Sequence, residues 1–225
     1  MEEDAAMDKR RILSTVCIIC GAVFLLLGTA VWLFVKNQSD KAGENAAVAV
    51  IQLHDLSEKE VVPAETPVSP APNASAPPVE EQVAQEEAET REVYQEYTAI
   101  FDGRAYLGLL YFPGYDLELP VLAEWDFPGL DLGPERYAGS IGSGSLVIGA
   151  HNYASHFSLL NNMEVGDQVV FTDVLGNEFR YVVRQTDVLK PSEQDLLLAE
   201  GWDLTLFTCT FGGQARQTLR CELVQ

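Results

Sequence analysis

Residues 204–209 read Leu-Thr-Leu-Phe-Thr-Cys, an apolar and β-branched run that ends in a cysteine. Such a run is typical of a short buried strand, and its last residue stands where the chain meets solvent. A second run, Ser-Leu-Val-Ile-Gly-Ala at 145–150, ends directly before His151. A third begins at Arg216, seven residues after the cysteine. The sequence therefore predicts a cysteine and a histidine that each stand at the end of a strand.

Further short runs of this kind continue through residues 105–225, with turn signals such as Pro-Gly and Gly-Asn between them. Their ranges are 105–112, 117–122, 167–173, 178–184 and 217–224. Two helical pieces are expected as well. One covers 154–163, and the other begins near Ser192, where Asp195 completes a capping-box pattern. Many short strands in about 120 residues predict a mainly β domain with one core, either a barrel or a sandwich.

The three residue types at these strand ends support nucleophilic acyl transfer. A thiolate is the reactive form of cysteine, and a nearby cation favours it. A histidine can donate a proton to a leaving amine near neutral pH, and a guanidinium can stabilise an oxyanion. Each residue also has a structural alternative: Cys209 as a core thiol, His151 as a turn residue and Arg216 as a solvated cation. Spacing alone does not decide between these interpretations.

Thr205-Leu206-Phe207-Thr208-Cys209 resembles the Thr-Leu-x-Thr-Cys signature of sortases, the membrane-anchored cysteine transpeptidases of Gram-positive bacterial surfaces. The stretch 147–152, Val-Ile-Gly-Ala-His-Asn, is similar to the family's strand that ends in its active-site histidine. Residues 105–225 fit the family's domain in length and in the order of these motifs. The resemblance implies a closed β-barrel of about eight strands with short helices, preceded by a single transmembrane helix and a disordered stalk.

The resemblance also implies roles for individual residues. Cys209 becomes the nucleophile and His151 the general acid and base. Many sortases have an arginine that opens the last strand and a second one four residues later, and Arg216 and Arg220 reproduce that spacing. We assign Arg216 to substrate and oxyanion contacts. Arg220 stays an alternative because residues four apart on a strand share a face, and Thr208 is a possible supporting residue.

The implied reaction joins two peptides. Cys209 attacks the Thr–Gly bond of a sorting signal that resembles Leu-Pro-x-Thr-Gly, and an amine then resolves the thioacyl-enzyme. The acceptor would be a peptidoglycan cross-bridge, lipid II or a pilin lysine. Two alternatives remain open: a membrane-anchored cysteine peptidase that uses water, and a catalytically silent surface-binding module.

We expect no cofactor and no metal. Five carboxylates could be suggested as calcium ligands, but scattered carboxylates on an acidic protein are usually solvated; they are Asp126, Asp131, Glu135, Asp173 and Glu178. His156 lies in the expected helix at 154–163, and we interpret it as structural. Cys221 is interpreted as a buried thiol. Cys17 and Cys20 form a Cys-x-x-Cys pair without a second ligand pair, and we interpret them as small apolar residues of a helix.

Residues 12–35 contain no charge. As a helix they would measure about 36 Å, which is enough to cross a hydrocarbon core of roughly 30 Å. The run is too long for the apolar core of a cleaved signal peptide, and it ends in Trp-Leu-Phe-Val. Basic residues at 9–11 favour a cytoplasmic N-terminus. We therefore expect a cytoplasmic segment at 1–11, a signal anchor in the cell membrane at 12–35 and an extracellular catalytic domain at 102–225.

The region between anchor and domain is predicted to have two parts. Residues 36–79 are expected to be an extended stalk because six of the 11 prolines lie between Pro63 and Pro78. From residue 80 helix formers take over, and aromatic residues at 94, 97 and 101 recur with helical spacing. The sequence predicts a helix over 80–101 that docks on the domain.

Charge excludes one class of partner. The 225 residues hold 14 Lys and Arg against 34 Asp and Glu, a net charge of −20. Counted by segment, the net is 0 for residues 1–41, −9 for 42–95 and −11 for 96–225. A nucleic-acid binder needs a basic surface to displace phosphate counterions, so no nucleic-acid partner is expected.

Overall fold

The computed structural model describes residues 2–55, 61–63 and 94–224; residues 1, 56–60, 64–93 and 225 lie outside this description. The described chain divides into two compact units, residues 1–41 and 42–225. Helix α1, Glu2–His54, begins in the first unit and ends in the second. From Ile18 it is long and apolar enough to cross a membrane, and side chains such as Phe24 and Leu25 are largely exposed. Length and composition are thus those of a membrane anchor.

The extended stalk expected over 36–79 is wrong for residues 36–54, which are helical. Ala42, Ala46, Ala49 and Leu53 recur at helical spacing and are all buried. Ala46 belongs to the main core of the second unit, so this last part of α1 is packed. The prolines that suggested extended chain begin only at residue 63, and the preceding alanines are strong helix formers.

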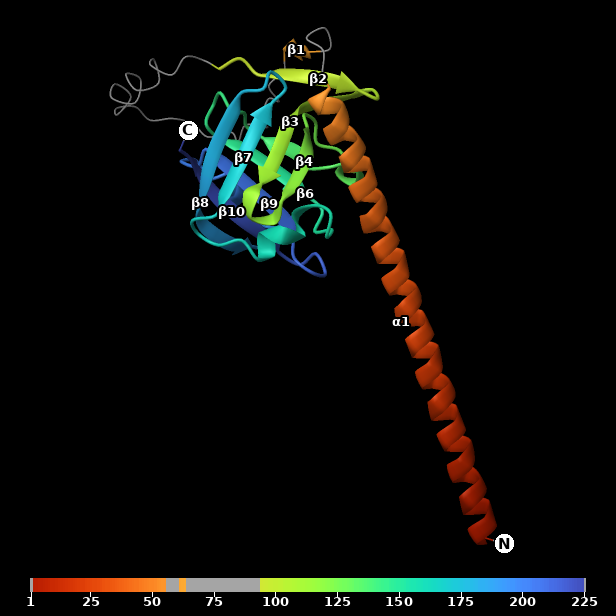
Figure 1. Ribbon diagram of the computed structural model, residues 1–225. Coiled ribbons are helices and arrows are strands. Elements are labelled where there is room, and N and C mark those ends of the chain that lie inside the picture. Colours follow the sequence, from red (N-terminus) through yellow and green to blue (C-terminus); the bar gives the residue numbers. More distant parts are fainter. Residues whose placement is uncertain (1, 56–60, 64–93, 225) are drawn as a thin grey trace. The chain divides into compact units, whose positions relative to one another are not determined.

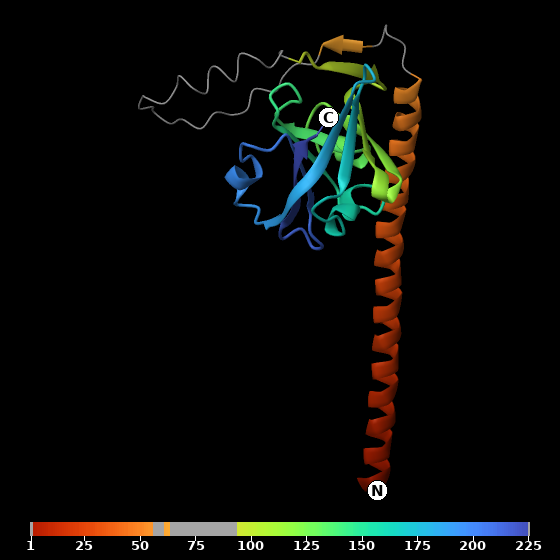
Figure 2. The same ribbon diagram turned by 60° about the vertical axis from the view of Figure 1, so that its left-hand side comes forward.

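Eight strands of the second unit form a closed barrel (Figures 1 and 2). The strand order is β3-β4-β5-β6-β9-β10-β8-β7, and β7 pairs with β3 to close it. The β4–β5 and β6–β9 pairs are parallel and the other pairs are antiparallel. The strands are β3 Arg104–Phe112, β4 Leu117–Leu122, β5 Glu135–Ala138, β6 Leu146–Ala150, β7 Gln168–Asp173, β8 Glu178–Leu189, β9 Leu204–Cys209 and β10 Arg216–Leu223. The mainly β barrel expected from the sequence is confirmed.

Two strands extend the sheet beyond the barrel: β1, Val61–Pro63, and β2, Tyr97–Phe101, which pairs with β3. The helix expected over 80–101 is therefore wrong at its C-terminal end, and residues 80–93 lie outside the described chain. Asp102 and Gly103 both have positive φ angles, 48° and 72°. An Asp-Gly pair in this conformation makes a tight hairpin turn. The aromatic residues at 97 and 101 therefore lie on a strand, although their spacing suggested a helix.

The other expected helices are shorter than predicted. Residues 154–163 contain only the 3-10 helix η4, Phe157–Asn161. The helix near Ser192 is α3, Gln194–Leu197, whose N-cap residue Glu193 makes no side-chain cap hydrogen bond, so the expected capping box does not form. Two further 3-10 helices are η2, Pro113–Tyr115, and η3, Gly129–Asp131.

Alternating residues of the strands divide between two cores. Leu146 and Ile148 of β6 and Leu206 of β9 point into the barrel and are fully buried there. The intervening residues, Val147 and Phe207, lie in a smaller cluster on the outer face, which α3 covers. Because side chains alternate along a strand, the outer face of β6 and β9 is the face that also carries the last residue of β9.

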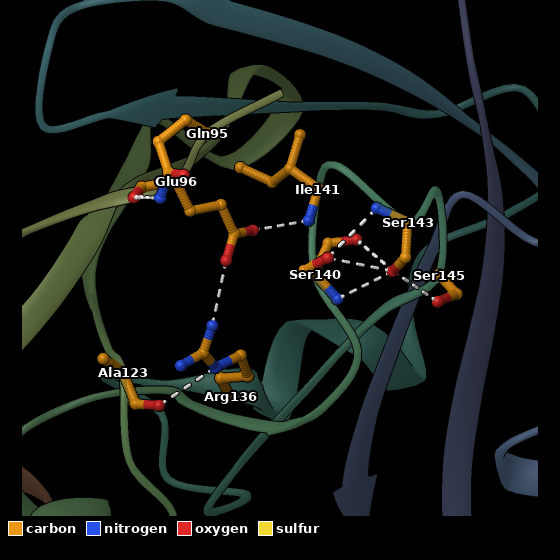
Figure 3. A network of polar contacts seen from close by, with 8 residues as sticks. All are labelled: Gln95, Glu96, Ala123, Arg136, Ser140, Ile141, Ser143 and Ser145. Atoms are coloured by element: carbon orange, nitrogen blue, oxygen red, sulfur yellow. Dashed lines mark hydrogen bonds and ion pairs between the residues drawn. The ribbon is translucent and has the colours of Figure 1, made fainter. Parts of the chain in front are cut away.

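A buried ion pair between Glu96 and Arg136 links the segment before β2 to the barrel (Figure 3). Arg136 of β5 donates one hydrogen bond to the carboxylate of Glu96 at 3.0 Å and another to the Ala123 carbonyl at 3.0 Å. The second Glu96 oxygen accepts a hydrogen bond from the backbone N–H of Ile141 at 2.5 Å. Glu96 therefore joins the segment before β2 to β5 and to the β5–β6 connection.

That connection is a tight serine-rich turn, which leads into β6 (Figure 3). The Ser143 hydroxyl donates to the Ser140 carbonyl at 2.9 Å, and the Ser143 N–H donates to the Ser140 hydroxyl at 3.0 Å. Gly139 has a φ of 69°, and a Cβ there would lie 1.9 Å from the Ser145 carbonyl oxygen. The turn therefore requires glycine at this position.

Glu96→Ala is expected to destabilise the domain strongly. The substitution takes the Glu96 carboxylate away from the buried Arg136 guanidinium, and breaking a buried pair in this way costs about 3–5 kcal/mol. The measurement is urea unfolding of the full chain in detergent micelles. Glu178→Ala is the matched control because it breaks the exposed Glu178–Arg180 pair and should change stability little. Equal losses for the two variants would contradict the role of Glu96.

Candidate active site

The pairing of β6, β9 and β10 brings three predicted residues to one end of the barrel. Ala150 of β6 pairs with Thr208 of β9 in parallel register, so His151, which follows β6, and Cys209, the last residue of β9, come at the same end of neighbouring strands. On the other side of β9, Arg216 pairs directly with Cys209. Neighbouring strands lie about 4.8 Å apart. Cys209, which is exposed, therefore stands between the histidine and the arginine.

Arg220 shares the outer face with Arg216, as the spacing predicted, but its guanidinium is fully engaged. It is buried, and its Nη1 donates to the Leu197 carbonyl at 2.8 Å and to the Thr205 hydroxyl at 3.0 Å. Its Nη2 donates to the Leu196 carbonyl, and its Nε lies 3.7 Å from Asp187. Arg220 thus holds α3 against the sheet, and its three guanidinium nitrogens all have partners there.

Arg216 is half-buried and keeps a donor free. Its guanidinium carbon lies 5.7 Å from the centre of the Phe207 ring, a cation–π distance. Among the described residues no acceptor binds its buried Nη1. An unsatisfied buried donor is costly, and a carbonyl or oxyanion of a bound peptide would satisfy it. Of the two arginines, Arg216 is thus the one that pairs with Cys209 across β9 and β10 and has a guanidinium donor without an acceptor among the described residues.

His151 lies between a carboxylate and an aromatic ring. Its Nε2 is 3.7 Å from Asp131 Oδ1, and its ring centre is 4.7 Å from that of Tyr153. Partial burial lowers the pKa of His151, and the Asp131 carboxylate opposes this by raising the pKa. Neither partner was expected at this place from the sequence, because Asp131 lies 20 residues before His151 in a loop that carries no motif.

The Thr208 side chain bonds to the backbone of the neighbouring strand β6. Its side chain is fully buried on the inner face of β9, and its hydroxyl donates to the Ala150 carbonyl at 2.8 Å. This bond ties β9 to β6 one residue before Cys209 and His151. Thr208 consequently fixes the relative position of the two strand ends and does not share the face of the thiol.

The remaining cysteine and histidine of the barrel are buried. Burial raises the pKa of Cys221 to about 12, so its thiol stays protonated and unreactive. His156 is fully buried, and burial lowers its pKa to about 4. The Tyr153 ring, 5.7 Å from the His156 ring, stands between it and His151. Both residues have the environments of structural groups.

An aromatic cluster that the sequence did not reveal lies beside the thiol. Trp125, Tyr137 and Phe207 contact one another with ring centres 4.9–5.9 Å apart. A Cβ at Gly149 would lie 2.5 Å from the Phe207 ring, so only glycine lets this ring lie against β6. The cluster forms an apolar surface on the outer face that Cys209 and Arg216 share.

The five carboxylates named above as conceivable calcium ligands do not form a metal-binding group. Among the described residues, no group of three or more His, Cys, Asp or Glu side chains is placed to hold a metal ion. Asp173 instead accepts hydrogen bonds from the N–H groups of Leu175 and Asn177. Glu135 is buried, its pKa is raised to about 8 by burial, and it accepts a hydrogen bond from the Asp126 N–H.

A family model of the sortase domain matches residues 110–224, which are just over half of the 225 residues. The chain belongs to the sortase family. The resemblance seen in the sequence is thereby confirmed. Comparison with curated protein sequences returns no significant match.

Solved sortase structures share the fold. Sortase A from Corynebacterium diphtheriae is 25% identical with a TM-score of 0.50, over 54% of this chain and 62% of that one. A structure of Clostridium perfringens sortase C with the C-terminal cell wall sorting motif is 24% identical with a TM-score of 0.48, over 53% of this chain and 71% of that one. Sortase C1 from Streptococcus suis is 25% identical with a TM-score of 0.46, over 53% of this chain and 73% of that one. The sortase described here thus spans less than two thirds of the Corynebacterium chain.

Substitution of Arg220 should destabilise the domain more than substitution of Arg216. Arg220→Ala leaves the buried Leu197 carbonyl and the buried Thr205 hydroxyl without this donor, and each such group costs about 1–3 kcal/mol, so we expect a loss of roughly 2 kcal/mol or more. Arg216→Ala removes one cation–π contact and should cost less than about 1 kcal/mol. Thermal unfolding of the full chain in detergent micelles measures both. The reverse order would contradict the structural role of Arg220.

Proposed function

We propose that this sortase is a cysteine transpeptidase that cleaves a Leu-Pro-x-Thr-Gly-like sorting signal between Thr and Gly and transfers the new carboxyl group to an amine. Membership of the sortase family supports a transpeptidase in general. The observation that supports the specific roles is the register of three strands, which leaves an exposed Cys209 between His151 and Arg216. Reactive thiol, proton donor and oxyanion partner are the groups that acyl transfer requires.

In the first half of the reaction, the Cys209 thiolate attacks the carbonyl carbon of the threonine. The free Nη1 donor of Arg216 stabilises the oxyanion of the tetrahedral intermediate. The C–N bond then breaks, and His151 in its protonated form gives its proton to the departing glycine amine. The products are a thioester on Cys209, a neutral His151 and a released C-terminal peptide.

In the second half, an acceptor amine attacks the thioester carbon. Neutral His151 takes the proton that this amine loses, the C–S bond breaks, and the Cys209 thiolate is restored. The net result exchanges one amide bond for another. The acceptor we propose is an amine of the cell wall, a peptidoglycan cross-bridge or lipid II, or a pilin lysine.

The proposed location is the outer face of a Gram-positive cell membrane. The apolar part of α1 supports a single membrane span. Basic residues at 9–11 precede it, and such an asymmetry favours a cytoplasmic N-terminus. The catalytic domain would then be extracellular, where sorting signals and cell-wall amines meet.

Cys209→Ala is expected to abolish both cleavage and transfer and to leave the fold intact, because the cysteine is exposed and lies outside the core. The assay incubates the full chain in detergent micelles with a sorting-signal peptide, with and without oligoglycine, and identifies products by mass. Cys221→Ala is the matched control and should remain active if it folds. A Cys209→Ala variant with undiminished transpeptidation would refute the mechanism.

The same assay separates the two alternatives. A peptidase would give the hydrolysed peptide in equal amount whether or not oligoglycine is present. A silent binding module would leave the peptide intact. The proposed transpeptidase gives the oligoglycine adduct as its main product when the amine is supplied.

A further inference from the structure

A carboxylate from outside the three active-site strands reaches His151. Asp131 ends η3 in the connection between β4 and β5, and its Oδ1 lies 3.7 Å from His151 Nε2. The Asp131 side chain is 63% exposed, whereas that of His151 is 33% exposed. The carboxylate therefore faces solvent, while the ring beside it is more buried.

Tyr153 connects the same two groups. Its ring stacks against the His151 ring at a tilt of 36°. Burial raises the pKa of Tyr153, and the Asp131 carboxylate, which is hydrogen-bonded to its hydroxyl, raises it further. The His151 ring is consequently held on its face by Tyr153 and on its Nε2 edge by Asp131.

The titratable and charged groups around His151 come from four parts of the fold. They are Asp131 from the β4–β5 connection, Tyr153 and His156 from the segment after β6, Cys209 from β9 and Arg216 from β10. Of these, Asp131 is the carboxylate. Buried His156 is uncharged at neutral pH because its pKa is about 4. Besides the Cys209 thiolate of the proposed reaction, Asp131 is therefore the anion beside the His151 ring.

We propose that Asp131 is a positioning residue for His151, which it orients through Nε2 and stabilises in the imidazolium form. A catalytic base is commonly oriented by a third group in this way. The distance of 3.7 Å is that of an ion pair and not of a hydrogen bond, so the attraction acts mainly on the protonated ring. With Nε2 turned toward Asp131, Nδ1 is the nitrogen that exchanges a proton with the substrate amine. The catalytic part of this inference rests on the proposed function.

The direct test does not require activity. The full chain is labelled with ¹³C-histidine in detergent micelles, and the pKa of each histidine is measured by NMR titration. Asp131→Asn should lower the pKa of His151, because the carboxylate that favours the charged ring is lost. Asp116→Asn is the matched control: it removes the same charge from an exposed turn with a φ of 48°, a conformation that asparagine also adopts. An unchanged His151, or an equal shift in the control, would overturn the proposal.

The kinetic arm uses the sorting-peptide assay. Asp131→Asn should slow formation of the thioacyl-enzyme about 10- to 100-fold, which is less than the 10²- to 10⁴-fold of general acid–base catalysis as a whole because His151 itself is kept. KM for the peptide should not change, and Asp131→Glu should recover part of the rate. The pH–rate profile should shift in the same direction as the NMR pKa.

The two arms distinguish this inference from the proposed function. If Asp131→Asn raised only the KM for the acceptor amine and left acylation unchanged, Asp131 would be an acceptor contact and the proposal would be wrong. If the wild-type chain processed no sorting peptide while the NMR shift was present, the proposed reaction would fail and the coupling of Asp131 to His151 would stand.

Discussion

The pairing of β9 with its two neighbours is the constraint that creates the site. Side chains alternate along a strand, so a slip of one residue would move Cys209 from the outer face into the barrel. The register is fixed on one side by the Thr208 hydroxyl, which binds the Ala150 carbonyl at 2.8 Å. On the other side it is fixed by six residue pairs between β9 and β10. Because leucines of β9 fill the core, any slip would also expose apolar side chains, and packing stability thus protects the geometry of the active site.

Burial then separates reactive groups from structural ones of the same type. Cys221 and His156 have side chains capable of the same chemistry as Cys209 and His151, but burial keeps them uncharged. The arginines divide in a similar way: Arg220 uses its donors on α3, while the buried Nη1 of Arg216 keeps its hydrogen free among the described residues. The site is therefore defined as much by which groups are left unsatisfied as by which groups are present.

Local sequence patterns predicted seven of the eight barrel strands, all but β5, together with the three strand-end residues, because period-two alternation and motif order are local signals. They did not predict Asp131 or the aromatic cluster, since those contacts join segments that are distant in the sequence and depend on barrel closure. The stalk prediction failed over 36–54 because the later prolines dominated the composition, although the alanines at 42, 46 and 49 form a helical face. The helix over 80–101 is wrong at its end because Asp102 and Gly103 form a hairpin turn, so the aromatic residues at 97 and 101 lie on a strand.

The reaction proceeds through a covalent bond to one sulfur atom, and that bond can be measured directly. The full chain is mixed with a sorting-signal peptide in the absence of an acceptor amine, quenched in acid, digested and analysed by mass spectrometry. The predicted result is a thioester between Cys209 and the peptide fragment that ends at threonine, which disappears when oligoglycine is added before the quench. Product formation with no adduct on Cys209, or an adduct on another residue, would contradict this account.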